Sequence, residues 1–189
     1  MSFPILILAS QSPRRTALLK KAGIKFKKIP SRIKETTRFR KPSSIVKDMA
    51  CRKAMAVAVR HPRSPVLGAD TIVYCRGKII GKPKSRKHAL KMLSMQNGAW
   101  QTVYSGVSLV WLSRGLCISG CDMAECKARK LAGTCLEQIA VKHLDKAGGY
   151  AAQDSGDFFI ERIKGRYDTV VGLPMNIVIK FLRKAGIAI

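Results

Sequence analysis

The sequence predicts an α/β fold in which a mixed central sheet is flanked by helices. Short apolar runs of strand length alternate along the chain with longer segments whose apolar residues recur at helical spacing. Hairpin signals among these segments indicate antiparallel pairs beside parallel ones. A length of 189 residues with 47% apolar residues suits a single domain over residues 1–189. We expect this domain to be built from two lobes.

The first elements follow from local signals near the N-terminus. A strand is expected at Ile5–Ala9. Ser12 is then placed to cap a helix that begins at Pro13, because proline favours the first helical position. Gly23 is expected to end this helix, and Ile24–Ile29 forms a second predicted strand. A strand therefore leads directly into a helix start.

A polar, basic loop and a long helix are expected next. Residues 31–42 show no periodicity, and we expect them to form a mobile loop that carries Glu35. Ser43 or Ser44 is expected to cap a helix that runs to about Val59. The predicted apolar face of this helix consists of Val46, Met49, Ala50, Ala54 and Val57.

Lys53 is the unusual residue of this helix. At 3.6 residues per turn it projects into the apolar face, whereas Asp48 and Arg52 point away from it. A lysine in an apolar stripe either extends its ammonium group to water or reaches into a site. The residue pattern leaves both interpretations open.

The rest of the chain continues the alternation of strands and helices. A strand at Val66–Ala69 is expected to end at Asp70. The remaining elements are expected as a hairpin over 72–75 and 78–80, a helix capped by Ser85, strands over 101–112 interrupted at Gly106, strands over 116–118 and 123–131, a helix over 134–143, a hairpin over 158–163 and 167–171, and a helix from Pro174 to about Ala185.

The charge is strongly one-sided. The chain contains 36 Lys and Arg residues and 11 Asp and Glu residues, which gives a formal net charge of +25. Such a field attracts polyanions, whether nucleotides, nucleic acid or anionic surfaces. No apolar run approaches the roughly 18 residues of a membrane span, and no secretory signal pattern opens the chain, so we expect a cytoplasmic protein without a membrane partner.

The metal-binding patterns built on cysteine and histidine are not found. The six cysteines form no Cys-x-x-Cys pair, and the three histidines stand far apart in the sequence. A zinc or iron–sulfur site is therefore not expected, and the cysteines are interpreted as reduced thiols.

Two stretches point to chemistry. The first helix start brings together Ser10, Ser12, Arg14 and Arg15, and helix N-termini hold anions through unpaired N–H groups. This stretch is either a polyphosphate site or an ordinary turn with solvated arginines. Asp70 is expected at the end of an apolar strand, where ligand groups gather in α/β folds, but a capping role is the alternative.

Five motifs, in this order, resemble those of the Maf family of nucleoside triphosphate pyrophosphatases. The resemblance covers nearly the whole chain, and ordered motifs are far more specific than any one alone. The motifs are Leu8-Ala9-Ser10-Gln11-Ser12-Pro13-Arg14-Arg15, Leu67-Gly68-Ala69-Asp70-Thr71, Gly81-Lys82-Pro83, Asp145-Lys146-Ala147-Gly148-Gly149-Tyr150 and Val170-Val171-Gly172-Leu173-Pro174.

The resemblance implies a reaction and a set of residues for it. The two lobes would enclose a nucleotide cleft, and a nucleoside triphosphate would be cleaved to the monophosphate and pyrophosphate by water attacking the α-phosphorus. A divalent cation (Mg²⁺, Mn²⁺ or Co²⁺) and a possible homodimer are also implied. The catalytic residues would be Asp70 as general base with Lys53, Lys82 and Glu35, the substrate-binding residues Ser10, Ser12, Arg14, Arg15, Thr71 and Gln153, and the metal ligands Glu35 and Asp70.

The resemblance also indicates a branch of the family. Arg14, Thr71 and Gln153 match the specificity positions of the branch that acts on dTTP and UTP, whereas Trp, Gln and Glu are usual in the branch preferring 7-methyl-GTP. Four departures from the family pattern are Lys34 for an acid, Gln101 for the frequent His, Ser105 for the frequent Thr, and Ala151-Ala152 for Gly-Ile. The last could alter the base pocket.

A competing hypothesis is a basic nucleic-acid-binding or division-arrest protein without required catalysis. The net charge of +25 motivates it. Carboxylates within a basic site would repel phosphate and serve no purpose in a simple binder. The few aromatic residues are not interleaved with the basic run, which disfavours a single-strand binder. The enzyme is the favoured hypothesis.

Overall fold

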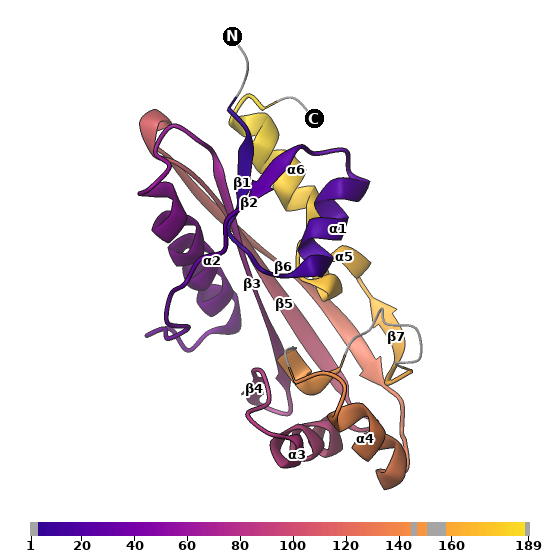
Figure 1. Cartoon of the computed structure of the whole chain (residues 1–189). Helices are drawn as coiled ribbons and strands as arrows, with labels where there is room; N and C mark the ends of the chain where they lie inside the picture. The colour runs from indigo at the N-terminus through magenta and orange to yellow at the C-terminus, as the bar shows by residue number, and fades with distance from the viewer. Residues whose placement is uncertain (1–3, 145–146, 151–157, 188–189) are drawn as a thin grey trace. The chain divides into compact units, whose positions relative to one another are not determined.

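Strands and helices alternate along the chain in the computed structural model, which describes residues 4–144, 147–150 and 158–187 (Figure 1). The elements, in chain order, are β1 (Leu6–Leu8), α1 (Pro13–Lys21), β2 (Phe26–Lys28), α2 (Pro42–Ala58), β3 (Val66–Cys75), β4 (Lys78–Ile80), α3 (Arg86–Gln96), β5 (Trp100–Trp111), the 3₁₀ turn η1 (Leu112–Arg114), β6 (Leu116–Ala128), α4 (Gly133–Ala140), η2 (Ala147–Gly149), β7 (Ile160–Lys164), α5 (Tyr167–Val171) and α6 (Met175–Lys184).

The strands of the described residues form one mixed sheet. Their order is β2-β1-β3-β5-β6-β7, and β4 pairs with β3. The β1 strand is parallel to both β2 and β3, with Ile7 opposite Lys27 and Val66. The pairs β3–β4 and β6–β7 are antiparallel. The predicted α/β class with a mixed sheet is therefore confirmed.

The chain divides into two compact units. Unit 1 comprises residues 1–70, 105–122 and 172–189, and unit 2 comprises residues 71–104 and 123–171. Three of the four boundaries fall within β3, β5 and β6, so each unit uses part of these strands, and the fourth lies between α5 and α6. A division into two units agrees with the expectation of two lobes, while the single domain over 1–189 stays a prediction.

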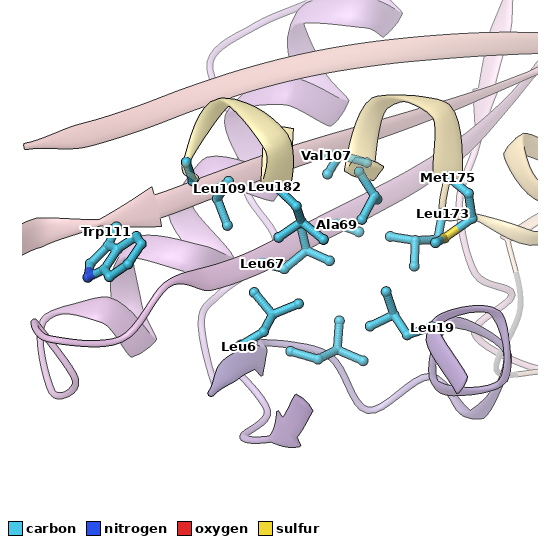
Figure 2. Close-up of a cluster of buried hydrophobic side chains, with 13 residues drawn as sticks. Leu6, Leu19, Leu67, Ala69, Val107, Leu109, Trp111, Leu173, Met175 and Leu182 are labelled. Carbon is cyan, nitrogen blue, oxygen red and sulfur yellow. The ribbon is translucent and has the colours of Figure 1, made fainter. Parts of the chain in front are cut away.

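The main core of unit 1 packs on one face of its strands. Alternate strand residues supply it, because successive side chains of a strand point to opposite faces. Leu67 and Ala69 from β3 and Val107 and Leu109 from β5 meet Leu19 of α1 and residues of α6 (Figure 2). The labelled members are Leu6, Leu19, Leu67, Ala69, Val107, Leu109, Trp111, Leu173, Met175 and Leu182.

Helix α2 packs on the opposite face of the unit 1 strands. Val66 and Val110 join Ala54, Val57 and other residues in a second apolar cluster. Two glycines allow the close approach. A Cβ at Gly68 would overlap the Ala50 carbonyl oxygen and lie 2.8 Å from Ala54 N, and a Cβ at Gly106 would overlap the backbone of Val46. Glycine is required at both positions for α2 to lie where it does.

Unit 2 has its own apolar clusters. One is formed between α3 and α4, which contact each other extensively, and includes Leu93, Leu136 and Phe159. The other is formed by β3, β4, β5, β6 and α3 and includes Val73, Ile80 and Met92. Ser85 caps α3 as predicted, because its hydroxyl accepts a hydrogen bond from His88 N at 3.1 Å.

Three predicted strand boundaries were wrong, because longer strands replace shorter ones. The β3 strand continues through Asp70 to Cys75, β5 continues through Gly106, and β6 joins the two strands predicted after it. A break at glycine was expected, but Gly106 is retained within β5 as the contact point for α2. Local turn signals cannot show that neighbouring strands pair across such positions.

Two further predictions concern helices. The cap of α2 is Lys41 with no side-chain hydrogen bond, and Ser43 and Ser44 lie in the first turn after Pro42, so the predicted serine cap was wrong. The segment Tyr167–Val171 is a helix and not a strand. Its β-branched residues favour a strand, but Thr169 and Val171 are buried in the helical turn. Asp168 lies in the first turn, where the helix dipole favours a negatively charged side chain.

No helix in the described part of the chain has the length and apolar character needed to cross a membrane.

Candidate functional site

The start of α1 is built as the sequence predicts. Ser12 is the N-cap, and its hydroxyl accepts from Arg15 N at 3.5 Å. The Ser10 hydroxyl, which is 7% exposed, accepts from Ser12 N at 3.2 Å. Both serines therefore order the turn between β1 and α1, and each hydroxyl retains a proton that it can donate. Arg14 is partly exposed on the first turn of α1.

Arg15 connects three segments of unit 1. Its Nε donates to the Gly172 carbonyl at 2.9 Å, and its Nη1 donates to the Ala69 carbonyl at 2.9 Å and to Ser10 Oγ at 3.1 Å. Burial lowers the pKa of Arg15, and the opposing attraction of Asp70 does not cancel this effect. The side chain thus holds the turn after β1 and the first half of β3 against the segment before α6. Its predicted contact with substrate stays a prediction.

Lys53 brings the two predicted carboxylates together. Its Nζ donates to Glu35 Oε1 and to Asp70 Oδ1, each at 2.7 Å. The Lys53 side chain is 11% exposed and that of Asp70 13%, whereas the Glu35 side chain is 50% exposed. The ammonium group of Lys53 therefore meets two carboxylates instead of extending freely to water, and its role in a site stays a prediction.

The strand geometry explains why Lys53 meets Asp70. Residues two apart on a strand share a face, so Asp70 lies on the same face of β3 as Gly68. That face is the one covered by α2, whose backbone touches Gly68. Because α2 lies this close, Lys53, three residues after Ala50, reaches along the strand to Asp70.

The loop that carries Glu35 is anchored by the outward face of α2. Thr37 Oγ1 donates to Asp48 Oδ2 at 2.9 Å. The Arg52 guanidinium donates to the Thr36 carbonyl and, at 3.4 Å, to the Lys34 carbonyl. Sequence reasoning correctly placed Asp48 and Arg52 away from the apolar face of the helix but missed this anchoring role. The available signal was their position on the same helix as Lys53, with Asp48 five residues and Arg52 one residue before it.

The other predicted site residues belong to unit 2 or lie outside the residues that the structure describes. Thr71 follows Asp70 on β3 and is partly exposed, and Lys82 is exposed in the turn after β4. Gly81, beside Lys82, accepts a hydrogen bond from Gly148 N at 3.1 Å, so two of the family-like motifs touch within unit 2. Gln153 and the Ala151-Ala152 departure fall outside the described residues.

The two carboxylates are of the ligand type that a hard divalent cation prefers. Glu35 and Asp70 each place an oxygen 2.7 Å from the Lys53 ammonium nitrogen, so this group occupies the point on which the two carboxylates converge. Among the described residues, no cluster of three or more His, Cys, Asp or Glu side chains is suited to a metal. Mg²⁺ is usually held by one or two carboxylates with substrate phosphates and water, which agrees with a two-carboxylate site.

The comparisons with known proteins identify the family of the chain. The model of the Maf family, described as Maf-like protein, matches residues 5–185. The chain belongs to the Maf family. Three relatives, each named dTTP/UTP pyrophosphatase, resemble this Maf chain over nearly all of its length.

The degree of similarity is substantial. The protein of Elusimicrobium minutum is 49% identical over 181 residues, which cover 96% of this chain and 98% of the relative. The protein of Thermosipho melanesiensis is 38% identical, with 90% and 92% covered. The protein of Bacillus anthracis is also 38% identical, with 96% of each chain covered. Family membership therefore extends across both units.

Proposed function

We propose that the chain hydrolyses nucleoside triphosphates, with dTTP and UTP as preferred substrates, to the monophosphate and pyrophosphate. The observation that carries the proposal is the Lys53 ammonium, which joins Glu35 and Asp70 at 2.7 Å each. Two carboxylates converging on a cation in a chain of net charge +25 suit metal-assisted phosphate chemistry better than simple anion binding. The names of the relatives support the same activity.

Asp70 is proposed as the general base. Lys53 holds Asp70 Oδ1, which fixes the direction of the carboxylate and leaves Oδ2 as the oxygen proposed to receive a proton from water. The water oxygen attacks the α-phosphorus while the bond from that phosphorus to the bridging oxygen breaks. The electron pair of that bond leaves with pyrophosphate, and no covalent intermediate with the protein forms.

Positive groups and a cation are proposed to stabilise the phosphates. Arg14, Lys53 and Lys82 neutralise phosphate oxygens, and the hydroxyls of Ser10 and Ser12 donate hydrogen bonds. Arg15 keeps Ser10 and the first half of β3 in place through the contacts described above. Glu35 and Asp70 would hold Mg²⁺, Mn²⁺ or Co²⁺, which supplies charge neutralisation at the phosphates when bound.

The preferred base is proposed to be a pyrimidine. Arg14, Thr71 and Gln153 match the residues expected in the dTTP/UTP branch, and the three relatives carry that name. A cytoplasmic location and association into a homodimer stay predictions. The nucleic-acid-binding or division-arrest alternative is not favoured, because relatives that cover nearly the whole chain are named as enzymes.

A hydrolysis screen with product identification tests the proposal. The chain is incubated with dTTP, UTP, dCTP, ATP, GTP and 7-methyl-GTP in the presence of Mg²⁺, Mn²⁺ or Co²⁺, and phosphorus NMR distinguishes pyrophosphate from phosphate. We expect pyrophosphate, fastest release from dTTP and UTP, and loss of turnover in EDTA that a divalent cation restores. Phosphate as the product, or undiminished turnover in EDTA, would contradict the mechanism, and no turnover with any substrate would favour the binding alternative.

A further inference from the structure

Two cysteines that take no part in the proposed reaction meet on the surface of unit 1. Cys51 Sγ and Cys117 Sγ lie 3.7 Å apart, although the residues are separated by 66 positions in the sequence. Cys51 is partly exposed on α2, and Cys117 is exposed near the start of β6. The contact therefore joins a helix and a strand of the same unit at a place that small molecules in solution can reach.

The packing of α2 explains how the two sulfur atoms meet. On β6, Ile118 packs into the core shared with α6, and a Cβ at Gly120 would lie 3.0–3.1 Å from side chains of α6. Cys117 and Ser119, which alternate with Ile118 and Gly120 along β6, point to the opposite face. Ser119 Oγ donates to Ser108 Oγ at 3.0 Å, and Ser108 lies beside Gly106 on the α2 side of β5. Cys117 thus faces α2.

We propose that Cys51 and Cys117 form a reversible disulfide when the chain meets a low-molecular-weight disulfide, and that α2 stays in place when the bond closes. A disulfide requires a sulfur separation of about 2.0 Å, and rotation of two side chains that already touch can supply the remaining approach. A pair joined in this way ties α2, which carries Lys53, to the sheet. The disulfide is independent of the proposed hydrolysis.

The reaction is a two-step thiol–disulfide exchange. The thiolate of the more exposed Cys117 attacks one sulfur of the external disulfide, so that a mixed disulfide forms and the first external thiolate leaves. The Cys51 thiolate then attacks the Cys117 sulfur, which closes the internal bond and releases the second external thiolate. Two electrons pass to the external disulfide, and the two thiol protons go to solvent. The large positive charge of the chain favours approach of an anionic oxidant.

The other cysteines differ in accessibility or in partner. Burial raises the pKa of Cys126 to about 12, so this thiol stays protonated at neutral pH. Cys75 is also buried, and its sulfur faces the Trp100 carbonyl at 3.7 Å. Burial and the hydrogen bond with Cys51 raise the pKa of Cys117 as well, so the exchange is expected to accelerate as pH rises. Cys121, four residues along β6, is the matched control because its sulfur contacts the Asp122 carbonyl.

Peptide mapping of the full chain tests the proposal. The reduced protein is treated with glutathione disulfide, remaining thiols are alkylated, and the digest is analysed by mass spectrometry without reduction. We expect a peptide pair linked through Cys51 and Cys117, the loss of two of the six thiols, and reversal by dithiothreitol. Cys51→Ser should accumulate the mixed disulfide at Cys117, while Cys121→Ser should form the link at the wild-type rate.

A thermal measurement tests whether α2 stays in place. A link that closes without distortion should raise the unfolding midpoint of the oxidised protein by about 4–10 °C relative to the reduced protein. The proposal is overturned if glutathione remains on Cys117 of the wild-type chain, if Cys121 takes the place of either partner, or if the link forms with a lower midpoint. Circular dichroism of each variant verifies that it is folded.

Discussion

The candidate residues of unit 1 and unit 2 differ in how far they are buried. In unit 1, Lys53, Asp70 and Arg15 are tied to one another or to backbone carbonyls by hydrogen bonds of 2.7–2.9 Å. In unit 2, Lys82 lies exposed in a turn. Most of the residues proposed to act on the phosphates, which every triphosphate shares, belong to unit 1, and Lys82 is the one from unit 2. A preorganised group of charges suits that task, because it does not have to reorganise during the reaction.

The largest expected effect is at the proposed base in unit 1. Asp70→Asn keeps the shape of the side chain and removes the proton acceptor, so turnover of dTTP should fall by about 10²–10⁴-fold. Because a negative charge near the phosphates is also removed, calorimetry should find nucleotide binding retained or strengthened. Glu137→Gln on the exposed face of α4 is the control and should leave turnover unchanged. Near wild-type turnover of Asp70→Asn would place the base elsewhere, with Glu35 as the next candidate.

The next largest effect is expected from the Lys53 ammonium group, which links the two carboxylates. Lys53→Met retains much of the apolar stem and removes the ammonium from Glu35 and Asp70, so turnover should fall by about 10²-fold. The uncompensated, mostly buried Asp70 should also lower the free energy of unfolding by about 1–3 kcal/mol, measured by urea denaturation. Lys47→Met, at an exposed position of the same helix, should change neither quantity. Equal behaviour of the two variants would remove Lys53 from the mechanism.

A smaller effect is expected in unit 2. Lys82→Ala removes one proposed phosphate contact from an exposed turn, so kcat/KM should fall by about tenfold while the free energy of unfolding stays within about 0.5 kcal/mol of wild type. Lys84→Ala is the matched control, since Lys84 is exposed two residues along the same segment. If both lysines lowered kcat/KM by the same factor, Lys82 would act only through general attraction of the nucleotide.

The smallest effect on turnover is expected from the packing beneath the unit 1 site. Gly68→Ala places a methyl group against the Ala50 carbonyl, and α2 must shift to make room. The free energy of unfolding should fall by about 1–3 kcal/mol, and kcat by less than the loss in Lys53→Met, because the ammonium is displaced but not removed. Gly133→Ala, where a Cβ would meet nothing within 4 Å, is the control. Wild-type stability of Gly68→Ala would contradict the close approach of α2.

The sequence by itself determined those features that depend on local periodicity and on turn chemistry. The alternation of strands and helices, the Ser12 cap before Pro13 and the place of Lys53 on the apolar face of α2 follow from repeats of two and 3.6 residues and from turn chemistry. The ordered motifs were sufficient to predict the family, which the match over residues 5–185 confirms. The substrate-contact roles that follow from this resemblance stay predictions.

Only the tertiary structure decided which of these residues meet. Lys53 reaches Asp70 because Gly68 allows α2 to lie against β3, and Arg15 bonds the Gly172 carbonyl across 157 positions of the sequence. The helix at Tyr167–Val171 and the contact between Cys51 and Cys117 were likewise not predicted. Periodicity reports which face a side chain occupies, but the distance between faces is set by the packing of distant segments.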